Sequence, residues 1–230
     1  MKIAVLGTGT VGRAFAEKLI ALNHEVMIGT RNVSEKLASA DKDFYGSAPF
    51  LEWHAQYQAI KLGTFAEAAQ FGEIVLNATK GIDSINALKQ AGEDNLNGKV
   101  LVDIANPLDF SQGMPPSLLP SLSNTNSLGE EIQKTFPDAK VVKALNTMWC
   151  GLMVNPNLLN GGDHTSFICG NDADAKEQVQ SLMKEFGWKA ENILDLGDIS
   201  SARGTEAMLP VWLRIYTATQ NGAFNFKVVS

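Results

Sequence analysis

Short apolar stretches alternate along most of the chain with stretches whose apolar residues recur at helical spacing. The apolar stretches have the length of buried β-strands, and we expect strands at residues 2–6, 25–29, 59–62, 73–78, 99–104, 140–145, 165–169 and 192–196. The helical spacing predicts helices at residues 13–22, 64–71, 84–91, 172–186 and 200–219. Strands that alternate with helices are typical of a parallel sheet covered on both faces. The pattern therefore predicts an α/β fold.

Two segments interrupt this alternation. Residues 43–57 are rich in aromatic side chains, and residues 107–126 contain four prolines among many Ser and Asn residues. The second segment predicts a long loop after the fifth strand. The last predicted helix carries apolar residues on more than one face, so we expect it to be buried on two sides, as in a homodimer.

A glycine-rich loop joins the first predicted strand to the first predicted helix, and it consists of Gly7, Thr8, Gly9, Thr10, Val11 and Gly12. In dinucleotide-binding loops of this kind, the first glycine permits a tight turn, the second lets the backbone approach a pyrophosphate, and the third lets helix and strand pack closely. N–H groups at the start of the helix then face the anion. We therefore expect a Rossmann-type, doubly wound and mostly parallel sheet with a small C-terminal helical extension. The nucleotide-binding domain would span residues 1–150 and the extension residues 151–230.

The residues after the second predicted strand indicate which dinucleotide binds. NAD-binding sites place a carboxylate here, which accepts hydrogen bonds from the ribose 2′-hydroxyl. This chain has Thr30 and Arg31 instead, with Lys36 nearby. A guanidinium can hold a 2′-phosphate through two hydrogen bonds, and a threonine hydroxyl can donate another. We therefore expect NADP(H) as the cofactor, the alternative being that Arg31 is an ordinary solvated surface charge.

Small or amide-bearing residues end the strands that would border the cofactor. They are Ala78 and Thr79 after the fourth strand, Asn106 after the fifth, and Ala144 and Asn146 at the end of the sixth. In a doubly wound sheet the cofactor crosses the carboxyl ends of the strands. These residues are therefore candidates to contact the ribose and the carboxamide. Asn is also common at the ends of strands simply because it favours turns. A cofactor contact and a turn-forming role therefore both stay open for Asn106 and Asn146.

No residue stands out as a catalytic acid or base. Dehydrogenases that act on alcohols need a side chain to exchange the hydroxyl proton. His24, His54 and His164 lie in a turn, in the aromatic segment and in a Gly-rich loop, where structural or surface histidines are more common than catalysts. Lys143 is the one lysine near the carboxyl ends of the predicted strands, and it could equally be an edge charge. Hydride transfer between a nicotinamide and a flavin-like ring makes lighter demands, because the cofactors carry the chemistry.

The composition narrows the range of partners. A net charge of −6 gives no electrostatic reason for binding to nucleic acid or to an anionic membrane. The two cysteines lie far apart without a zinc-binding or disulfide pattern, so we expect no metal site and a reduced, cytoplasmic protein. No apolar run has the length of a membrane span. We expect the partner to be a small-molecule electron acceptor.

Several blocks of the sequence together resemble the NADP oxidoreductases that depend on coenzyme F420, a deazaflavin. They are residues 7–12 with 29–31, residues 141–147, residues 168–172, and residues 194–203 with Glu206. The last block is also similar to the cytoplasmic reductase domain of the STEAP metalloreductases. The resemblance implies an NADPH site at the glycine loop, Thr30 and Arg31, with the acceptor ring stacked on the nicotinamide near Asn106 and residues 146–149. Members that reduce deazaflavin can have histidine in place of Asn146, so FMN and FAD stay open as acceptors.

Three functions are compatible with these observations. The first is an NADPH-dependent reductase of the deazaflavin F420 or of a flavin. The second is a dehydrogenase or imine reductase of a small metabolite, which would need a proton donor such as Lys143 at the nicotinamide. The third is a nonenzymatic NADPH-binding sensor, in which the aromatic segment would be a partner surface. A deep apolar groove without a positioned acid would favour the first.

Overall fold

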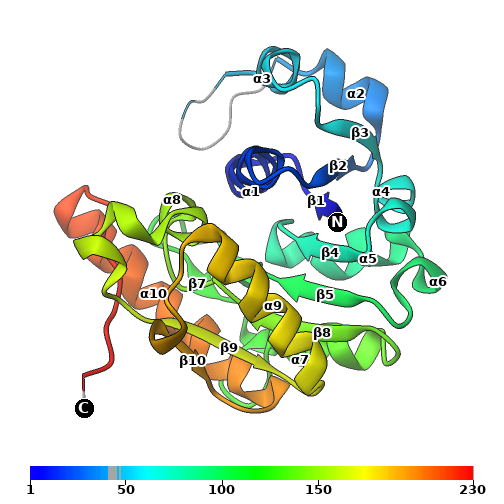
Figure 1. The fold of residues 1–230 in the computed structure, drawn as a ribbon. Helices are drawn as coiled ribbons and strands as arrows, with labels where there is room; N and C mark the ends of the chain where they lie inside the picture. The colour runs from blue at the N-terminus through cyan, green and yellow to red at the C-terminus, as the bar shows by residue number, and fades with distance from the viewer. Residues whose placement is uncertain (41–45, 47, 230) are drawn as a thin grey trace.

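An eight-stranded sheet forms the centre of the computed structural model, which describes residues 1–40, 46 and 48–229 (Figure 1). In chain order its strands are β1 (Lys2–Leu6), β2 (Glu25–Thr30), β3 (Lys61–Thr64), β4 (Ile74–Asn77), β5 (Val100–Asp103), β8 (Lys140–Ala144), β9 (Ser166–Gly170) and β10 (Ile193–Asp195). Their order across the sheet is β3-β2-β1-β4-β5-β8-β9-β10. Neighbouring strands from β3 to β8 run parallel, β9 runs antiparallel to β8, and β10 runs parallel to β9. The doubly wound, mostly parallel sheet of the Rossmann type is therefore confirmed.

Helices cover both faces of the sheet (Figure 1). They are α1 (Thr10–Ala21), α2 (Val33–Ala38), α3 (Phe50–Gln56), α4 (Phe65–Phe71), α5 (Ser84–Ala91), α6 (Glu93–Leu96), α7 (Leu128–Thr135), α8 (Cys150–Val154), α9 (Ala173–Phe186) and α10 (Ala202–Thr219). Phe15 of α1 and Phe186 of α9 belong to the core on one face, and Leu88 of α5 and Ile132 of α7 to the core on the other. Within the described ranges, no helix is long and apolar enough to cross a membrane. A cytoplasmic location stays a prediction.

The structure corrects several predicted boundaries. The third strand lies at Lys61–Thr64 and not at residues 59–62, because its pairing with β2 begins at Lys61 and Thr64 ends it as the N-cap of α4. The hydrophobic pattern predicts neither α7 nor α8, and α8 is too short to show a helical repeat. The long loop at residues 107–126 contains a short antiparallel ribbon, formed by β6 (Leu108–Asp109) and β7 (Ser117–Leu118).

Helix α3 of the aromatic segment lies beside α1 (Figure 1). Its residues 43–45 and 47 fall outside the described residues, and α3 forms most of the rest. Phe50 and Trp53 of α3 are buried, with their ring centroids 5.3 Å apart. These rings therefore serve as core residues and not as an exposed aromatic surface.

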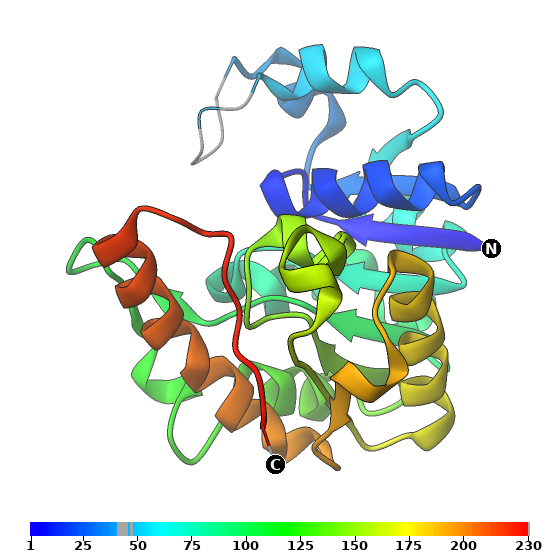
Figure 2. The same ribbon diagram turned by 60° about the vertical axis from the view of Figure 1, so that its left-hand side comes forward.

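The C-terminal part of the chain extends the sheet and then folds back. β9 and β10 add to the sheet beyond β8, and α10 buries Trp212 while leaving Val211 52% exposed. The segment after α10 turns back along that helix (Figure 2), where Phe224 stacks on Trp212 and the carbonyl of Phe226 accepts a hydrogen bond from the N–H of Thr165. The homodimer through α10 and the domain boundary at residue 150 stay predictions.

The capping box of α4 gives a test of the fold. We expect Thr64→Ala to lower the free energy of unfolding by about 1 kcal/mol, because the threonine hydroxyl accepts a hydrogen bond from the N–H of Glu67 in the first turn. Urea denaturation measures the change. Thr217→Ala, on an exposed part of α10, is the control, and an equally large effect there would contradict the capping argument.

Candidate functional site

Two glycines let the loop after β1 pass close to neighbouring backbone. Gly7 has a φ of +117°, and a Cβ at this position would lie 2.5 Å from the carbonyl oxygen of Ala78. A Cβ on Gly12 would lie 1.9 Å from the carbonyl oxygen of Gly7. Both distances are far inside van der Waals contact, so side chains are excluded at these two positions. The loop can therefore turn directly from β1 into α1 beside the end of β4.

Gly9 differs from the other two glycines because a Cβ there would meet nothing within 4 Å. Gly9 is exposed and occupies the N-cap of α1, where it has no side chain to cap the first turn. The start of a helix attracts anions through its N–H groups and its dipole. The space over Gly9 thus fits a pyrophosphate that approaches the backbone, and the loop residues from Gly7 to Gly12 fit a dinucleotide.

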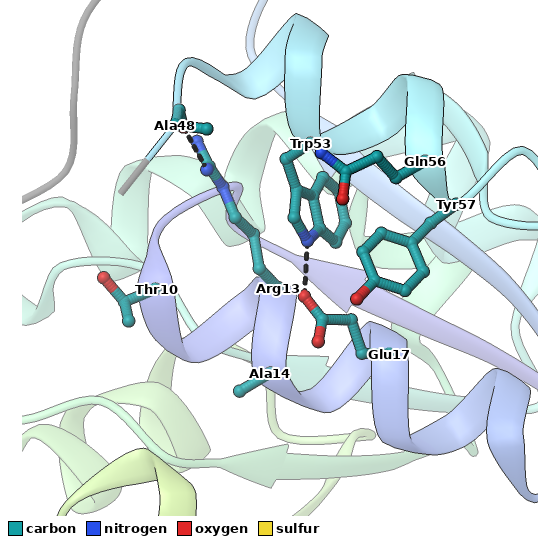
Figure 3. A pocket seen from close by; sticks show the side chains of 8 residues that line it. All are labelled: Thr10, Arg13, Ala14, Glu17, Ala48, Trp53, Gln56 and Tyr57. Atoms are coloured by element: carbon teal, nitrogen blue, oxygen red, sulfur yellow. Dashed lines mark hydrogen bonds between the residues drawn. The ribbon is translucent and has the colours of Figure 1, made fainter. Parts of the chain in front are cut away.

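Arg13 fixes the orientation of this loop, although the sequence analysis did not identify it. Its Nε donates to the carbonyl oxygen of Thr8 at 3.1 Å and its Nη1 to that of Ala48 at 2.7 Å (Figure 3). In a trans peptide the C=O and the following N–H point in opposite directions. Holding the carbonyl of Thr8 toward Arg13 therefore directs the N–H of Gly9 away from the guanidinium.

A pocket of about 260 Å³ separates α1 from α3 and is lined by Thr10, Arg13, Ala14, Glu17, Ala48, Trp53, Gln56 and Tyr57 (Figure 3). The indole N–H of Trp53 donates to the carboxylate of Glu17. Burial, with the nearby Glu17 carboxylate, raises the pKa of Tyr57, which keeps the phenol protonated. These polar contacts bind α3 to α1 next to the glycine loop.

The residues expected to select NADP lie at the end of β2. Thr30 is the last residue of the strand and is 9% exposed, while Arg31 follows it on the surface. Lys36 lies on α2 with its ammonium 5.5 Å from the centroid of the Phe50 ring. Thr30 and Arg31 thus lie together at the carboxyl ends of the strands, and Lys36 lies against Phe50 of α3. A role for the three in binding a 2′-phosphate stays a prediction.

The carboxyl ends of β5 and β8 are joined by a pair of asparagines. Asn106 Nδ2 donates to the backbone oxygen of Asn146 at 2.8 Å, and Asn146 Nδ2 donates to Asn106 Oδ1 at 2.9 Å. Leu145 has a φ of +61°, a left-handed conformation that is rare for a side chain of this size. Such strain is typical of functional sites. We call Asn106 and Asn146 the asparagine pair.

Two buried polar atoms beside the asparagine pair lack partners among the described residues. They are Asn146 Oδ1 and Thr147 Oγ1, in residues that are each 1% exposed. An unsatisfied buried polar atom costs free energy, so such atoms are often ligand contacts. A carboxamide offers both a donor and an acceptor, and it therefore fits these two atoms. Sequence reasoning identified Asn146 as a cofactor contact and included Thr147 only within the stretch 146–149 near the acceptor ring.

Ala78 and Thr79 border the same edge at the end of β4. Both are partly exposed, and the hydroxyl of Thr79 donates to Asn77 Oδ1 at 2.6 Å. A Cβ at Gly81 would lie 2.0 Å from the carbonyl oxygen of Asn106, so the segments after β4 and β5 are in close contact. The structure therefore brings Thr79 and Asn106 into one continuous rim.

Lys143 does not lie where an accessible proton donor would. Its side chain has no exposed surface, and its Nζ lies 2.8 Å from Asp103 Oδ2 and 2.7 Å from Glu206 Oε1. The sequence left Lys143 open as a lysine near the rim or as an edge charge. The structure supports neither an accessible donor nor an edge charge, because two carboxylates hold the ammonium inside the protein. Ala144 is also fully buried. Its contact with the cofactor stays a prediction.

Each of the three histidines has a protein partner in the described structure. The partner is a carboxylate for His24 and a backbone carbonyl for His54 and His164, at distances of 2.8 to 3.0 Å. His164 is also 2% exposed. These contacts match the structural role expected for all three.

Comparisons with known proteins identify the family of this chain. The family model for NADP oxidoreductases that are coenzyme F420-dependent matches residues 2–107. A solved structure from Arthrobacter sp. FB24, named as an F420-dependent NADP-reductase, is 54% identical, covers 100% of both chains and superposes with a TM-score of 0.94. This chain belongs to that family. It is an NADP-dependent oxidoreductase.

Two further relatives cover nearly the whole chain. The F420-dependent NADP reductase of Methanothermobacter marburgensis is 26% identical over 220 residues, which are 94% of this chain and 92% of that protein. Metalloreductase STEAP3 of Rattus norvegicus is 30% identical over 217 residues. This match covers 92% of the chain but only 38% of the rat protein. The expected resemblance to both families is therefore confirmed.

The glycine loop gives a matched pair of variants. We expect Gly9→Ala to fold normally and to lose at least tenfold in NADPH affinity, because the new Cβ would occupy space at the phosphate position without touching the protein. Gly12→Ala should instead destabilise the protein, since its Cβ would overlap the Gly7 carbonyl. Thermal unfolding and calorimetric titration separate the two effects. Unchanged NADPH binding by Gly9→Ala would contradict a pyrophosphate at this loop.

Proposed function

We propose that this NADP-dependent oxidoreductase transfers a hydride between NADP(H) and a flavin-like ring, and that the ring is the deazaflavin F420. The observation that carries the proposal is the rim at the ends of β5 and β8. Asn146 and Thr147 offer unpartnered polar atoms there, whereas Lys143 and the histidines are engaged with other groups in the described structure. Such a rim suits a reaction that needs alignment more than proton transfer.

Three groups of residues would bind three different parts of the cofactor. The backbone at Gly9 and the start of α1 would hold the pyrophosphate. Thr30 and Arg31 would bind the 2′-phosphate, and Arg31 would do so with the two-pronged geometry of a guanidinium. The asparagine pair and Thr147 would orient the carboxamide. NADP(H) would therefore extend from the end of β2 to the end of β8.

For this reaction the protein must align the nicotinamide with the acceptor ring and exclude water. NADPH, when bound, supplies a hydride whose electron pair forms a new bond on the acceptor ring, leaving NADP⁺, while a solvent proton completes the reduced acceptor. The asparagine pair would hold the carboxamide and thereby orient the nicotinamide. Fixing this geometry in advance lowers the entropy cost of the transfer. No side chain is required to exchange a substrate proton.

The names of the relatives favour F420 as the acceptor. The family description, the Arthrobacter structure and the Methanothermobacter protein all name this coenzyme. The sequence departs from deazaflavin-reducing members at Asn146, where histidine can occur. FMN and FAD are therefore the acceptors to compare with F420.

The two alternatives lack such support. An imine reductase or a dehydrogenase of a small metabolite would need Lys143 at the nicotinamide, and the side chain of Lys143 is fully buried. A nonenzymatic sensor would use the aromatic segment as a partner surface, but Phe50 and Trp53 of that segment are buried. Both alternatives are outcomes of the test below.

Arg31→Ala tests the cofactor part of the proposal. We expect it to raise the dissociation constant for NADPH by about 10- to 100-fold, the effect of losing a charge-assisted hydrogen bond of about 1.5–3 kcal/mol, and to leave NADH binding unchanged. Fluorescence titration measures both constants. Arg214→Ala, an exposed arginine on α10, is the control for net charge. Equal losses for NADPH and NADH would contradict a 2′-phosphate contact.

The acceptor is tested by following NADPH oxidation with F420, FMN and FAD offered in turn. We expect F420 to be reduced with a kcat/KM at least tenfold above those of the two flavins. Rapid turnover of FMN or FAD alone would reassign the acceptor. NADPH binding without turnover of any of the three would contradict the proposed reaction and favour the sensor.

A further inference from the structure

Asp103, Lys143 and Glu206 form a buried ion cluster between the sheet and α10. Their side chains are 0%, 0% and 1% exposed, and the ammonium of Lys143 lies within 2.8 Å of both carboxylates. Two carboxylates thus share one ammonium. Burying charges away from water costs free energy. The net charge of this cluster therefore affects the electrostatics of the groups around it.

The hydrogen-bond partners of both carboxylates favour their ionised forms. Asp103 accepts from Asn77 Nδ2 and from the N–H of Ala105 as well as from Lys143. Glu206 accepts from Lys143 and from the N–H groups at residues 128 and 129. A protonated carboxyl group would need an acceptor, and every one of these partners is a donor. The cluster therefore carries a net charge of about −1, which the start of α7 offsets in part.

Cys169 lies near the cluster and adds no charge to it. Burial raises the pKa of the Cys169 thiol to about 12, which keeps it neutral. Burial acts to lower the pKa of Lys143, but its two carboxylates together outweigh this effect and raise the pKa, so the ammonium stays charged. Burial raises the pKa of Glu206, and the positive charge of Lys143 opposes that rise.

The cluster is in contact with residues that adjoin the rim of the proposed nicotinamide site. Asp103 is the last residue of β5, and Lys143 Nζ donates to the carbonyl oxygen of Ala105 at 2.5 Å. Ala105 immediately precedes Asn106 of the asparagine pair. Asn77, which bonds to Asp103, also accepts from Thr79 at the end of β4. A chain of buried contacts therefore connects the cluster to three of the strand ends that form the rim.

We propose that the net negative charge of the buried ion cluster makes the site favour the oxidised, cationic nicotinamide over the reduced, neutral one. The inference rests on the proposed position of the nicotinamide at this rim. A fixed charge stabilises an opposite charge far more in a buried setting than across water. NADP⁺ carries a positive nicotinamide ring and NADPH does not. The cluster therefore changes the affinity for NADP⁺ more than the affinity for NADPH. The same bias favours hydride donation by NADPH.

The test compares the dissociation constants of NADP⁺ and NADPH by calorimetry, with no acceptor present. For the wild type we expect NADP⁺ to bind more tightly than NADPH. Glu206→Gln and Asp103→Asn each remove one negative charge and should raise the ratio of the NADP⁺ constant to the NADPH constant on the order of tenfold. Lys143→Gln removes the positive charge and should shift the ratio in the opposite direction, which loss of structure alone would not do.

Glu177→Gln, an exposed carboxylate on α9, is the matched control and should leave the ratio unchanged. Thermal unfolding shows which variants fold. Tighter binding of NADPH by the wild type, or an unchanged ratio in the cluster variants that fold, would overturn the inference. If the ratio shifts as expected but no flavin-like ring is reduced in the turnover assay, the proposed acceptor fails and the inference stands.

Discussion

The close approach of backbone around Gly7 and Gly12 is the constraint on which the site depends. A Cβ at either position would overlap a carbonyl oxygen, at 2.5 Å and 1.9 Å respectively. Because these side chains are absent, α1 begins directly beside the end of β4 and presents its first turn at the carboxyl edge of the sheet. Arg13 then fixes the carbonyl of Thr8 and joins the loop to the segment before α3. The pyrophosphate position follows from this geometry.

The other half of the site depends on contacts between distant parts of the sequence. Glu206 of α10 binds Lys143 of β8, which in turn binds Asp103 of β5. These contacts attach the C-terminal extension to the strands that carry the asparagine pair. The extension therefore stabilises the edge at which the nicotinamide is proposed to lie, and it places a fixed charge near that edge.

The sequence predicts most of the fold because the signals for it are local. Strand-length apolar stretches and the glycine loop are readable within a few residues, and each of the eight predicted strands overlaps an observed one. Boundaries failed where a local contact overrides the pattern, as at Thr64, which ends β3 in order to cap α4. Helix α8 was missed because its five residues cannot show a helical repeat.

The site was predictable only in part, for a related reason. The glycine loop, Thr30, Arg31 and the two asparagines follow strands and can be located from the sequence. The carboxylate partners of Lys143 are Asp103 and Glu206, and no local pattern connects residues that are so far apart. Lys143 was therefore interpreted as a rim lysine, although it is a buried ion. The unpartnered hydroxyl of Thr147 likewise becomes visible only when its surroundings are known.

Direct transfer of deuterium is the most direct test of the central claim. NADPH that carries deuterium at the transferable position of the nicotinamide C4 is incubated anaerobically with the protein and oxidised F420, and the reduced coenzyme is analysed by mass spectrometry. A deazaflavin accepts the hydride on carbon, so the deuterium does not exchange with water. We predict that the reduced F420 contains the deuterium lost from NADPH. Reduced F420 without deuterium, or NADPH that keeps its label, would contradict hydride transfer between the two rings.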